Sequence, residues 1–360
     1  MITRSVFGTL PGGETVERIE LTLANGFSAA ILTWGATLQS LRSPDREGRF
    51  ASVVLGYTTL DDYRNAGGRL GATMGRYANR IENGHFHLDG QDHQLQRNEG
   101  RHAIHGGPEG FDRRLWSVES ILDLPDRPEV RLRLESPDGD QGFPGRLVLT
   151  VSYALKAPGD LVISYEASSD RPTVFNTTNH AYFNLAGEGS GSVLDHRFTI
   201  PADRFLPVND ELIPTGEIRN VDGTEFDFRE ARPLAAGIRA DDPQIRLGRG
   251  YDHCYVLSEN GPEPYPRLAA RVEEEQSGRQ LEVLTTEPGL QLHSGNVLTG
   301  RYHGASGRAY RQSDGFCLEA QHFPNAPNAA HFPSTVLRPG KPYRSITIYR
   351  LGITPSLARS

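Results

Sequence analysis

Four polar clusters in this sequence contain side chains that can exchange protons or hold hydroxyl groups. They are the segments 75–81 with 98–107, 176–185, 250–254, and 288–291 with 317–321. Together they supply carboxylates, imidazoles, amides and a guanidinium, a combination suited to general acid–base chemistry on a polyhydroxylated ligand. No G-x-S-x-G, P-loop or G-x-G-x-x-G motif accompanies them, so the usual signatures of acyl transfer, nucleotide hydrolysis and dinucleotide redox chemistry are missing.

Glu319 is the residue whose position is hardest to explain by structure alone. It stands between Leu318 and Ala320 in the strand-like stretch 316–320, where an acid would need a partner or a cavity. The other residues have ordinary structural interpretations. A histidine after a strand is most often a hydrogen-bonded structural residue, Arg80 could pair with a carboxylate, and Asp252 could cap a turn.

A metal site is a weaker interpretation of the same clusters. Possible ligands are His102, His105, His180, His253, His293 and Glu319. They could form a site of two histidines and one carboxylate, but neither H-x-E nor H-E-x-x-H occurs, so we expect no metal. The two cysteines, Cys254 and Cys317, are too few for a disulfide framework and are expected to be buried thiols.

Composition and charge limit the partners of this chain of 360 residues. Lys and Arg number 38 against 45 Asp and Glu, and the net charge of −7 gives no electrostatic basis for binding nucleic acid. No apolar stretch approaches the roughly 18 residues that a membrane helix needs, and no signal core follows Met1. We therefore expect a cytoplasmic protein that binds neither membranes nor nucleic acid.

The elements that must position the clusters are mostly strands. Alternating runs around short turns predict hairpins at 19–32, 85–95 and 268–285, and branched residues at period two predict strands at 130–134, 147–155, 161–167 and 345–351. Helices are scarce: 59–65 could form a capped turn or two, and 230–240 has helical composition interrupted by Pro233. The sequence therefore predicts an all-β protein, a large antiparallel sandwich of two stacked sheets with few short helices.

The clusters together resemble the aldose 1-epimerase, or galactose mutarotase, family. The matching segments are 75–81, 105–107, 179–185, 251–253, 288–291, and 318–321 with 323–328. They occur in family order, so the resemblance spans most of the chain and implies one domain over residues 1–360 with the large β-sandwich of that family. It also implies a monosaccharide substrate and no cofactor.

The resemblance implies a role for seven residues. The catalytic ones would be Glu319 as general base, His180 as general acid, and His105 as an imidazole that hydrogen-bonds the sugar near its reacting end. The substrate-binding ones would be Arg80, Asp252 and Gln291, with Asn79 orienting its neighbour. Acid–base ring opening of a hemiacetal needs no cofactor, and we expect a neighbouring carboxylate to raise the pKa of His180.

Three questions stay open at this level. Leu292-His293 stands where the family commonly has an aromatic pair, which affects the expected sugar preference and leaves the proposed acid and base unchanged. A hexose-phosphate 1-epimerase would need a second guanidinium beside Arg80, for which Arg76 is available. A carbohydrate-binding protein without activity would not require both Glu319 and His180. Neither the preferred aldose nor the oligomeric state follows from the sequence.

Overall fold

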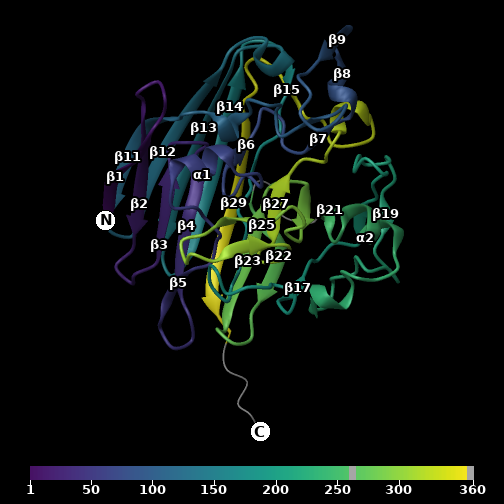
Figure 1. The fold of residues 1–360 in the computed structure, drawn as a ribbon. Coiled ribbons are helices and arrows are strands. Elements are labelled where there is room, and N and C mark those ends of the chain that lie inside the picture. Colours follow the sequence, from purple (N-terminus) through teal and green to yellow (C-terminus); the bar gives the residue numbers. More distant parts are fainter. Residues whose placement is uncertain (259–264, 355–360) are drawn as a thin grey trace.

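Antiparallel strands dominate the computed structural model, which describes residues 1–258 and 265–354 (Figure 1). Within these ranges the α-helices are α1 (Leu60–Asn65) and α2 (Pro243–Gly248), each of six residues. Single 3₁₀ turns occur at Glu82–Gly84, Phe111–Arg113, Asp140–Gly142, Leu234–Ala236 and Ala326–Asn328. The predicted all-β class is confirmed.

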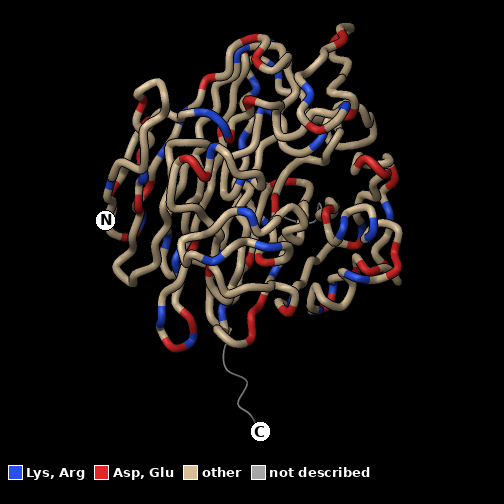
Figure 2. Tube along the Cα trace, viewed as in Figure 1, with Lys and Arg blue, Asp and Glu red and all other residues tan. Residues whose placement is uncertain are grey.

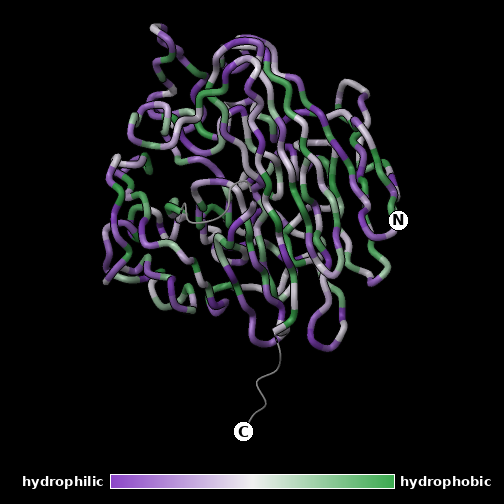
Figure 3. The backbone as a smooth tube through the Cα atoms, turned by 180° about the vertical axis from the view of Figure 1, so that it is seen from behind, coloured by the Kyte–Doolittle hydropathy of each residue, from purple (hydrophilic) through white to green (hydrophobic). Residues whose placement is uncertain are grey.

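One long sheet forms the back of the molecule as Figure 1 shows it. In the described residues it has nine strands, in the order β11 (Ser117–Leu124), β12 (Arg127–Ser136), β13 (Leu147–Lys156), β14 (Asp160–Ser169), β29 (Tyr343–Ile353), β23 (Arg279–Thr285), β22 (Arg267–Glu273), β17 (Arg197–Thr199) and β20 (Arg232–Pro233). The strands alternate apolar and polar residues, as the banding in Figure 3 shows from behind. One face of this sheet is therefore turned to the core and the other to solvent.

Two smaller sheets cover the inner face. The N-terminal sheet has the order β1 (Ile2–Thr9), β2 (Thr15–Thr22), β3 (Ser28–Leu32), β4 (Thr37–Pro44) and β5 (Phe50–Ser52), and packs on β12 and β13. The other, which we call the third sheet, has the order β19 (Arg219–Asn220), β18 (Arg204–Leu206), β21 (Asp252–Val256), β24 (Gly289–His293) and β27 (Cys317–Gln321). All these pairings are antiparallel, as the predicted sandwich requires.

Short two-stranded ladders complete the described strands. They pair β7 (Arg80–Ile81) with β10 (Ala103–Ile104), β6 (Thr73–Met74) with β16 (Thr178–Asn179), β15 (Thr173–Val174) with β28 (Val336–Leu337), β8 (His85–Leu88) with β9 (Gln91–Gln94), and β25 (Thr299–His303) with β26 (Ala309–Arg311). The β7–β10 and β6–β16 ladders hold the segments that carry Arg80, His105 and His180.

The predicted hairpins form, with one difference in turn chemistry. In the β8–β9 turn, Asp89 and Gly90 both have positive φ, 49° and 82°, as a two-residue turn requires. In the β2–β3 turn only Gly26 does, at 88°, because this connection is longer and a single left-handed residue suffices.

The helix predictions are partly corrected. Thr59 caps α1 as its spacing suggests, accepting a hydrogen bond from the Asp62 amide. The segment 230–240 contains a β-bridge strand and only one 3₁₀ turn, because Pro233 lies in the middle of it. Helix α2 was not predicted, although Asp242 caps it and Pro243 occupies its first position.

One hydrophobic core links the sheets. It includes Ile19 and Leu38 from the N-terminal sheet, Val151 and Tyr349 from the long sheet, and Leu318 from the third sheet. Charged residues are interspersed along the trace rather than gathered by sign (Figure 2). No helix among the described residues is long and apolar enough to span a membrane.

Candidate active site

A cleft of about 160 Å³ opens beside the third sheet. Its lining residues are Gly68, Arg69, Asn79, Arg80, Glu99, Ile104, His105, His180, Tyr182, Asp252, His293, Val297 and Glu319. Six of the seven residues that we assigned to a site from the sequence are in this set, and the seventh, Gln291, pairs with Glu319 in the β24–β27 register and hydrogen-bonds to Asp252. Four separate parts of the sequence therefore converge on one cleft.

Strand β27 places Glu319 by simple alternation. Leu318 and Ala320 point into the main core, while Glu319 points to the opposite face, which lines the cleft. Only 3% of Glu319 is exposed, and its Oε2 has no hydrogen-bond partner among the described residues. A buried carboxylate oxygen without a partner is costly unless a ligand satisfies it.

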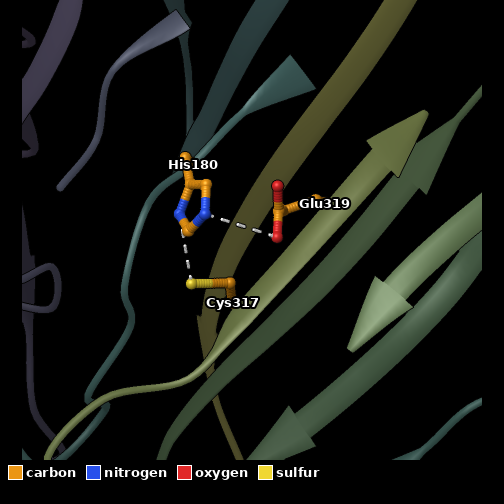
Figure 4. A group of neighbouring side chains, drawn as sticks. All are labelled: His180, Cys317 and Glu319. Carbon is orange, nitrogen blue, oxygen red and sulfur yellow. Dashed lines mark hydrogen bonds and ion pairs between the residues drawn. The ribbon is translucent and has the colours of Figure 1, made fainter. Parts of the chain in front are cut away.

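His180 follows β16 and faces Glu319 (Figure 4). Its Nε2 lies 3.7 Å from Glu319 Oε1, and its Nδ1 lies 3.5 Å from the Cys317 Sγ. The imidazole stacks on Tyr182, with ring centroids 5.2 Å apart. Contacts on both nitrogens and one ring face fix the orientation of His180 toward the carboxylate.

His105 forms a second wall, with its ring centroid 5.3 Å from that of His180. The Asn79 amide donates to His105 Nδ1 at 3.2 Å, and burial lowers the pKa of His105 well below its ordinary value. The neutral ring must then carry its proton on Nε2. The Asn79 side chain accepts from the Arg80 backbone amide, so residue 79 hydrogen-bonds to both His105 and Arg80.

Arg80 and Asp252 form a charged end of the cleft. The Arg80 guanidinium donates twice to Glu99, at 2.6 and 2.9 Å, and its Nη1 lies 3.8 Å from Asp252. Gln291 Nε2 donates to Asp252 Oδ1 at 2.7 Å. Burial opposes ionisation of Asp252, but His293, Arg80 and Gln291 together hold its pKa below the ordinary value.

The charge state of the central pair differs from the sequence-based expectation. Burial, with a contribution from Asp252, raises the pKa of Glu319 to about 8. We expected a carboxylate to raise the pKa of His180; burial, together with the nearby His293 and Arg69, instead lowers it to about 3. At neutral pH the pair in the free site therefore holds one proton, on the carboxyl group.

Among the lining residues that were not assigned to the sugar site from the sequence are Arg69 and His293. Arg69 lines the cleft and pairs with buried Asp112 at 3.2 Å, and neither residue belongs to a recognisable motif. His293 was named as a possible metal ligand and, with Leu292, as a departure from the family that affects the sugar preference, but it was given no role in binding the sugar. The position of His293 two residues after Gln291 could have indicated a role in the cleft, because strand alternation puts residues 291 and 293 on the same face.

The remaining sequence candidates lie elsewhere. His102 Nδ1 accepts from the Asn83 amide, and His253 contacts Gln244, so both are structural. Arg76 is not available for a phosphate group: it is 2% exposed and donates to the carbonyls of Ser136, Pro137, Pro144 and Gly145 and to the Ser136 hydroxyl.

Comparison with known proteins finds relatives of this chain among sugar epimerases. A sequence model of the family described as aldose 1-epimerase matches residues 17–350. The chain is 43% identical to a galactose mutarotase of Sus scrofa, covering 96% of this chain and 97% of that protein. It is 40% identical to an aldose 1-epimerase of Escherichia coli K12, covering 94% and 96% of the two chains. A solved galactose 1-epimerase from Lactobacillus acidophilus superposes with a TM-score of 0.86 at 29% identity, covering 99% of each chain.

Proposed function

Because this chain belongs to the aldose 1-epimerase family, we propose that it interconverts the α and β anomers of a free aldose in the cleft around Glu319. Such an enzyme is an isomerase. The observation that carries the assignment of residues is the 3.7 Å separation of His180 Nε2 and Glu319 Oε1 inside a cleft that a small ligand can enter. Two proton-exchanging groups on one substrate are what anomerisation needs.

The reaction is a proton exchange that opens and recloses the sugar ring. Glu319 takes the proton of the C1 hydroxyl, the bond between C1 and the ring oxygen breaks, and His180 gives a proton to that oxygen. The resulting free aldehyde rotates about the C1–C2 bond. Reclosure on its other face reverses both transfers, so no atom or electron is gained or lost. General acid–base groups contribute on the order of 10² to 10⁴ each to such a rate.

The single proton of the pair suffices for this cycle. In the free site it resides on Glu319, whose pKa is about 8, and His180 is neutral. Moving it to His180 gives the carboxylate and imidazolium that the forward step uses, without a proton from solvent. A sugar hydroxyl donating to Glu319 would favour the carboxylate form, because hydrogen bonds to a charged group stabilise that form.

The remaining polar groups would hold the sugar. The ionised Asp252 accepts from hydroxyl groups, and Arg80, anchored by Glu99, donates to them. The Nε2–H of His105 donates near the reacting end. Gln291 acts through Asp252, whose carboxylate it fixes by a hydrogen bond. These roles predict that Glu319 and His180 govern turnover, whereas Asp252 governs binding.

The two alternative functions have less support. A phosphorylated sugar would need free guanidinium groups, but Arg80 is paired with Glu99 and Arg69 with Asp112. A binding protein without activity would not need the Glu319–His180 pair. Rates with hexose and hexose phosphate, and binding measured without turnover, separate these possibilities.

Polarimetry on freshly dissolved, anomerically pure sugars tests the proposal. Glu319→Gln and His180→Asn should each remove most activity, on the order of 10² or more, with little change in folding. Asp252→Ala should mainly raise KM. Near-normal rates in Glu319→Gln would show that the base is misassigned. A panel of aldoses would identify the preferred one.

A single domain over residues 1–360 and a cytoplasmic location are further parts of this proposal. One hydrophobic core drawing on residues from Ile19 to Leu351 supports the single domain. Two buried thiols support a reducing compartment.

A further inference from the structure

Three potential metal ligands of different chemistry meet at the proposed catalytic pair. Cys317 and Glu319 lie on the same face of β27, two residues apart, and His180 lies opposite them (Figure 4). With one ligand atom taken from each residue, the three atoms lie within 4.8 Å of one another, and all three residues are buried. We propose that Cys317, His180 and Glu319 form a site for a borderline-soft divalent cation of the Zn²⁺ type, which competes with the sugar.

The ligand set selects this class of cation. Zn²⁺ binds thiolate at about 2.3 Å and imidazole or carboxylate at about 2.0–2.2 Å, so its ligand atoms stand about 3.3–3.8 Å apart in a tetrahedron. The 3.5 Å contact from His180 Nδ1 to Cys317 Sγ is in this range, whereas the 3.7 Å contact to Glu319 is made by the other ring nitrogen, Nε2. One cation uses only one ring nitrogen, so small side-chain rotations must bring the three atoms together. Mg²⁺ and Ca²⁺ prefer oxygen ligands and disfavour the thiolate.

Charge balance allows such a cation at a buried position. A thiolate and a carboxylate together cancel the two positive charges, and an imidazole coordinates as a neutral ligand. The Cys317 thiol and the Glu319 carboxyl release their protons to solvent as the metal binds. The Glu319 Oε2, which has no hydrogen-bond partner among the described residues, would become a metal ligand. The open cleft leaves the fourth coordination position of the cation to water.

Binding would have a functional consequence. The cation would occupy both groups proposed to exchange protons, so it should inhibit, and sugar should oppose its binding. The inhibition rests on the proposed function, whereas the binding itself does not. We therefore base the test on a spectroscopic signal that needs no turnover.

The experiment titrates the purified full chain with Co²⁺, a spectroscopic substitute for Zn²⁺. We expect one equivalent to produce a thiolate-to-cobalt charge-transfer band that Zn²⁺ or a chelator abolishes. Cys317→Ser should remove the band and weaken binding at least tenfold. Cys254→Ser is the matched control, because Cys254 is the other buried thiol and is not part of the cluster with His180 and Glu319. It should keep the band.

A second control addresses adventitious surface binding. His85 and His87 both contact Asp92 on the exposed β8–β9 hairpin, so His87→Ala should leave the charge-transfer band unchanged. If Cys317→Ser fails to fold, Glu319→Gln serves instead, with weaker binding and a retained sulfur band.

Three results would overturn the proposal: no band in the unaltered protein, a band that persists without Cys317, or occupancy that an excess of sugar does not reduce. A band in the cobalt-loaded protein, with no mutarotation by the same protein before cobalt is added, would contradict the proposed function and leave the metal site standing. Full mutarotation at full zinc occupancy would contradict a shared site.

Discussion

The carboxyl group of Glu319 is buried, and this burial decides its protonation state. Burial and Asp252 raise the pKa of Glu319 to about 8. Its raised value means that the pair with His180 keeps one proton below about pH 8 and loses it above. We expect kcat/KM to be level near neutral pH and to fall about tenfold per unit above pH 8, because no proton then remains for the ring oxygen. Polarimetric rates from pH 6 to 10, corrected for the buffer reaction, measure this; a rise through pH 8 would contradict it.

His293 offers a further donor to the sugar. The Gly295 amide donates to His293 Nδ1 at 3.2 Å, and burial lowers the pKa of the ring, so the neutral ring carries its proton on Nε2. No described residue hydrogen-bonds to Nε2, and the ring lines the cleft. His293→Phe should raise KM about 2- to 12-fold, the worth of one neutral hydrogen bond of about 0.5–1.5 kcal/mol, with little change in kcat.

The control for that variant is His303→Phe, on the exposed end of β25, which should leave KM unchanged. A panel of singly deoxygenated sugars would identify the hydroxyl involved. If removing a particular hydroxyl raises KM in the unaltered protein but not in His293→Phe, that hydroxyl is the partner of Nε2–H. An unchanged KM for every sugar would remove His293 from the binding residues.

Sequence reasoning at the residue scale found which side chains meet and missed their protonation. The residue types and their order carried the resemblance, so Glu319, His180 and His105 were assigned before any geometry. The shift in the pKa of His180 was predicted in the wrong direction. Its direction depends on whether burial, which lowers the pKa, outweighs the attraction of a nearby carboxylate, and the extent of burial is known only from the folded cleft. Arg69 gave no signal, because its partner Asp112 is 43 positions away.

At the scale of elements, β27 continues from the cleft into a second buried pair. His322, directly after the strand, contacts Glu287 through Nδ1 at 2.7 Å, and Tyr343 donates to the same carboxylate. Burial opposes both charges, but the attraction raises the pKa of His322 and lowers that of Glu287. This pair holds the end of β27 against β29.

The pair should make stability depend on pH. The contribution of His322 is complete below the unfolded pKa, about 6.5, and is lost as pH rises through its higher folded value. The contribution of Glu287 is complete above about 4.5 and is lost at lower pH. Stability from the pair is therefore greatest between about pH 4.5 and 6.5. Denaturant unfolding should show a decline above pH 6.5 that is smaller in His322→Gln; an equal decline in both proteins would contradict this.

Strands were easier to predict than their partners. Alternation and Asp-Gly or Asn-Gly turns located the hairpins, because these are local signals. The order of the nine-stranded sheet was not predictable, since β29 lies between β14 and β23, strands far from it in the sequence. The helix α2 was missed because six residues are too few to show a helical period.

At the scale of the whole molecule, Arg76 joins the loop before β7 to the connection between β12 and β13. Its guanidinium donates to four backbone carbonyls and the Ser136 hydroxyl while being almost wholly buried. Arg76→Met removes the hydrogen bonds that Arg76 donates to these acceptors and should cost about 3–5 kcal/mol in the free energy of unfolding. Arg171→Met, at an exposed ion pair, is the control and should change stability by less than about 1 kcal/mol. Equal losses in both variants would contradict the role of Arg76.

Consecutive residues of β27 serve the interior and the cleft in turn, which limits how this protein can change over evolutionary time. Insertion or deletion of one residue in that strand would exchange the two sides at once, putting an acid among aliphatic groups and leucine in the cleft. Residues of β27 can therefore be substituted, but the number of residues in the strand cannot change. Changes in sugar preference must therefore arise at exposed residues that line the cleft, such as Val297, where a substitution does not disturb the packing of the sheets.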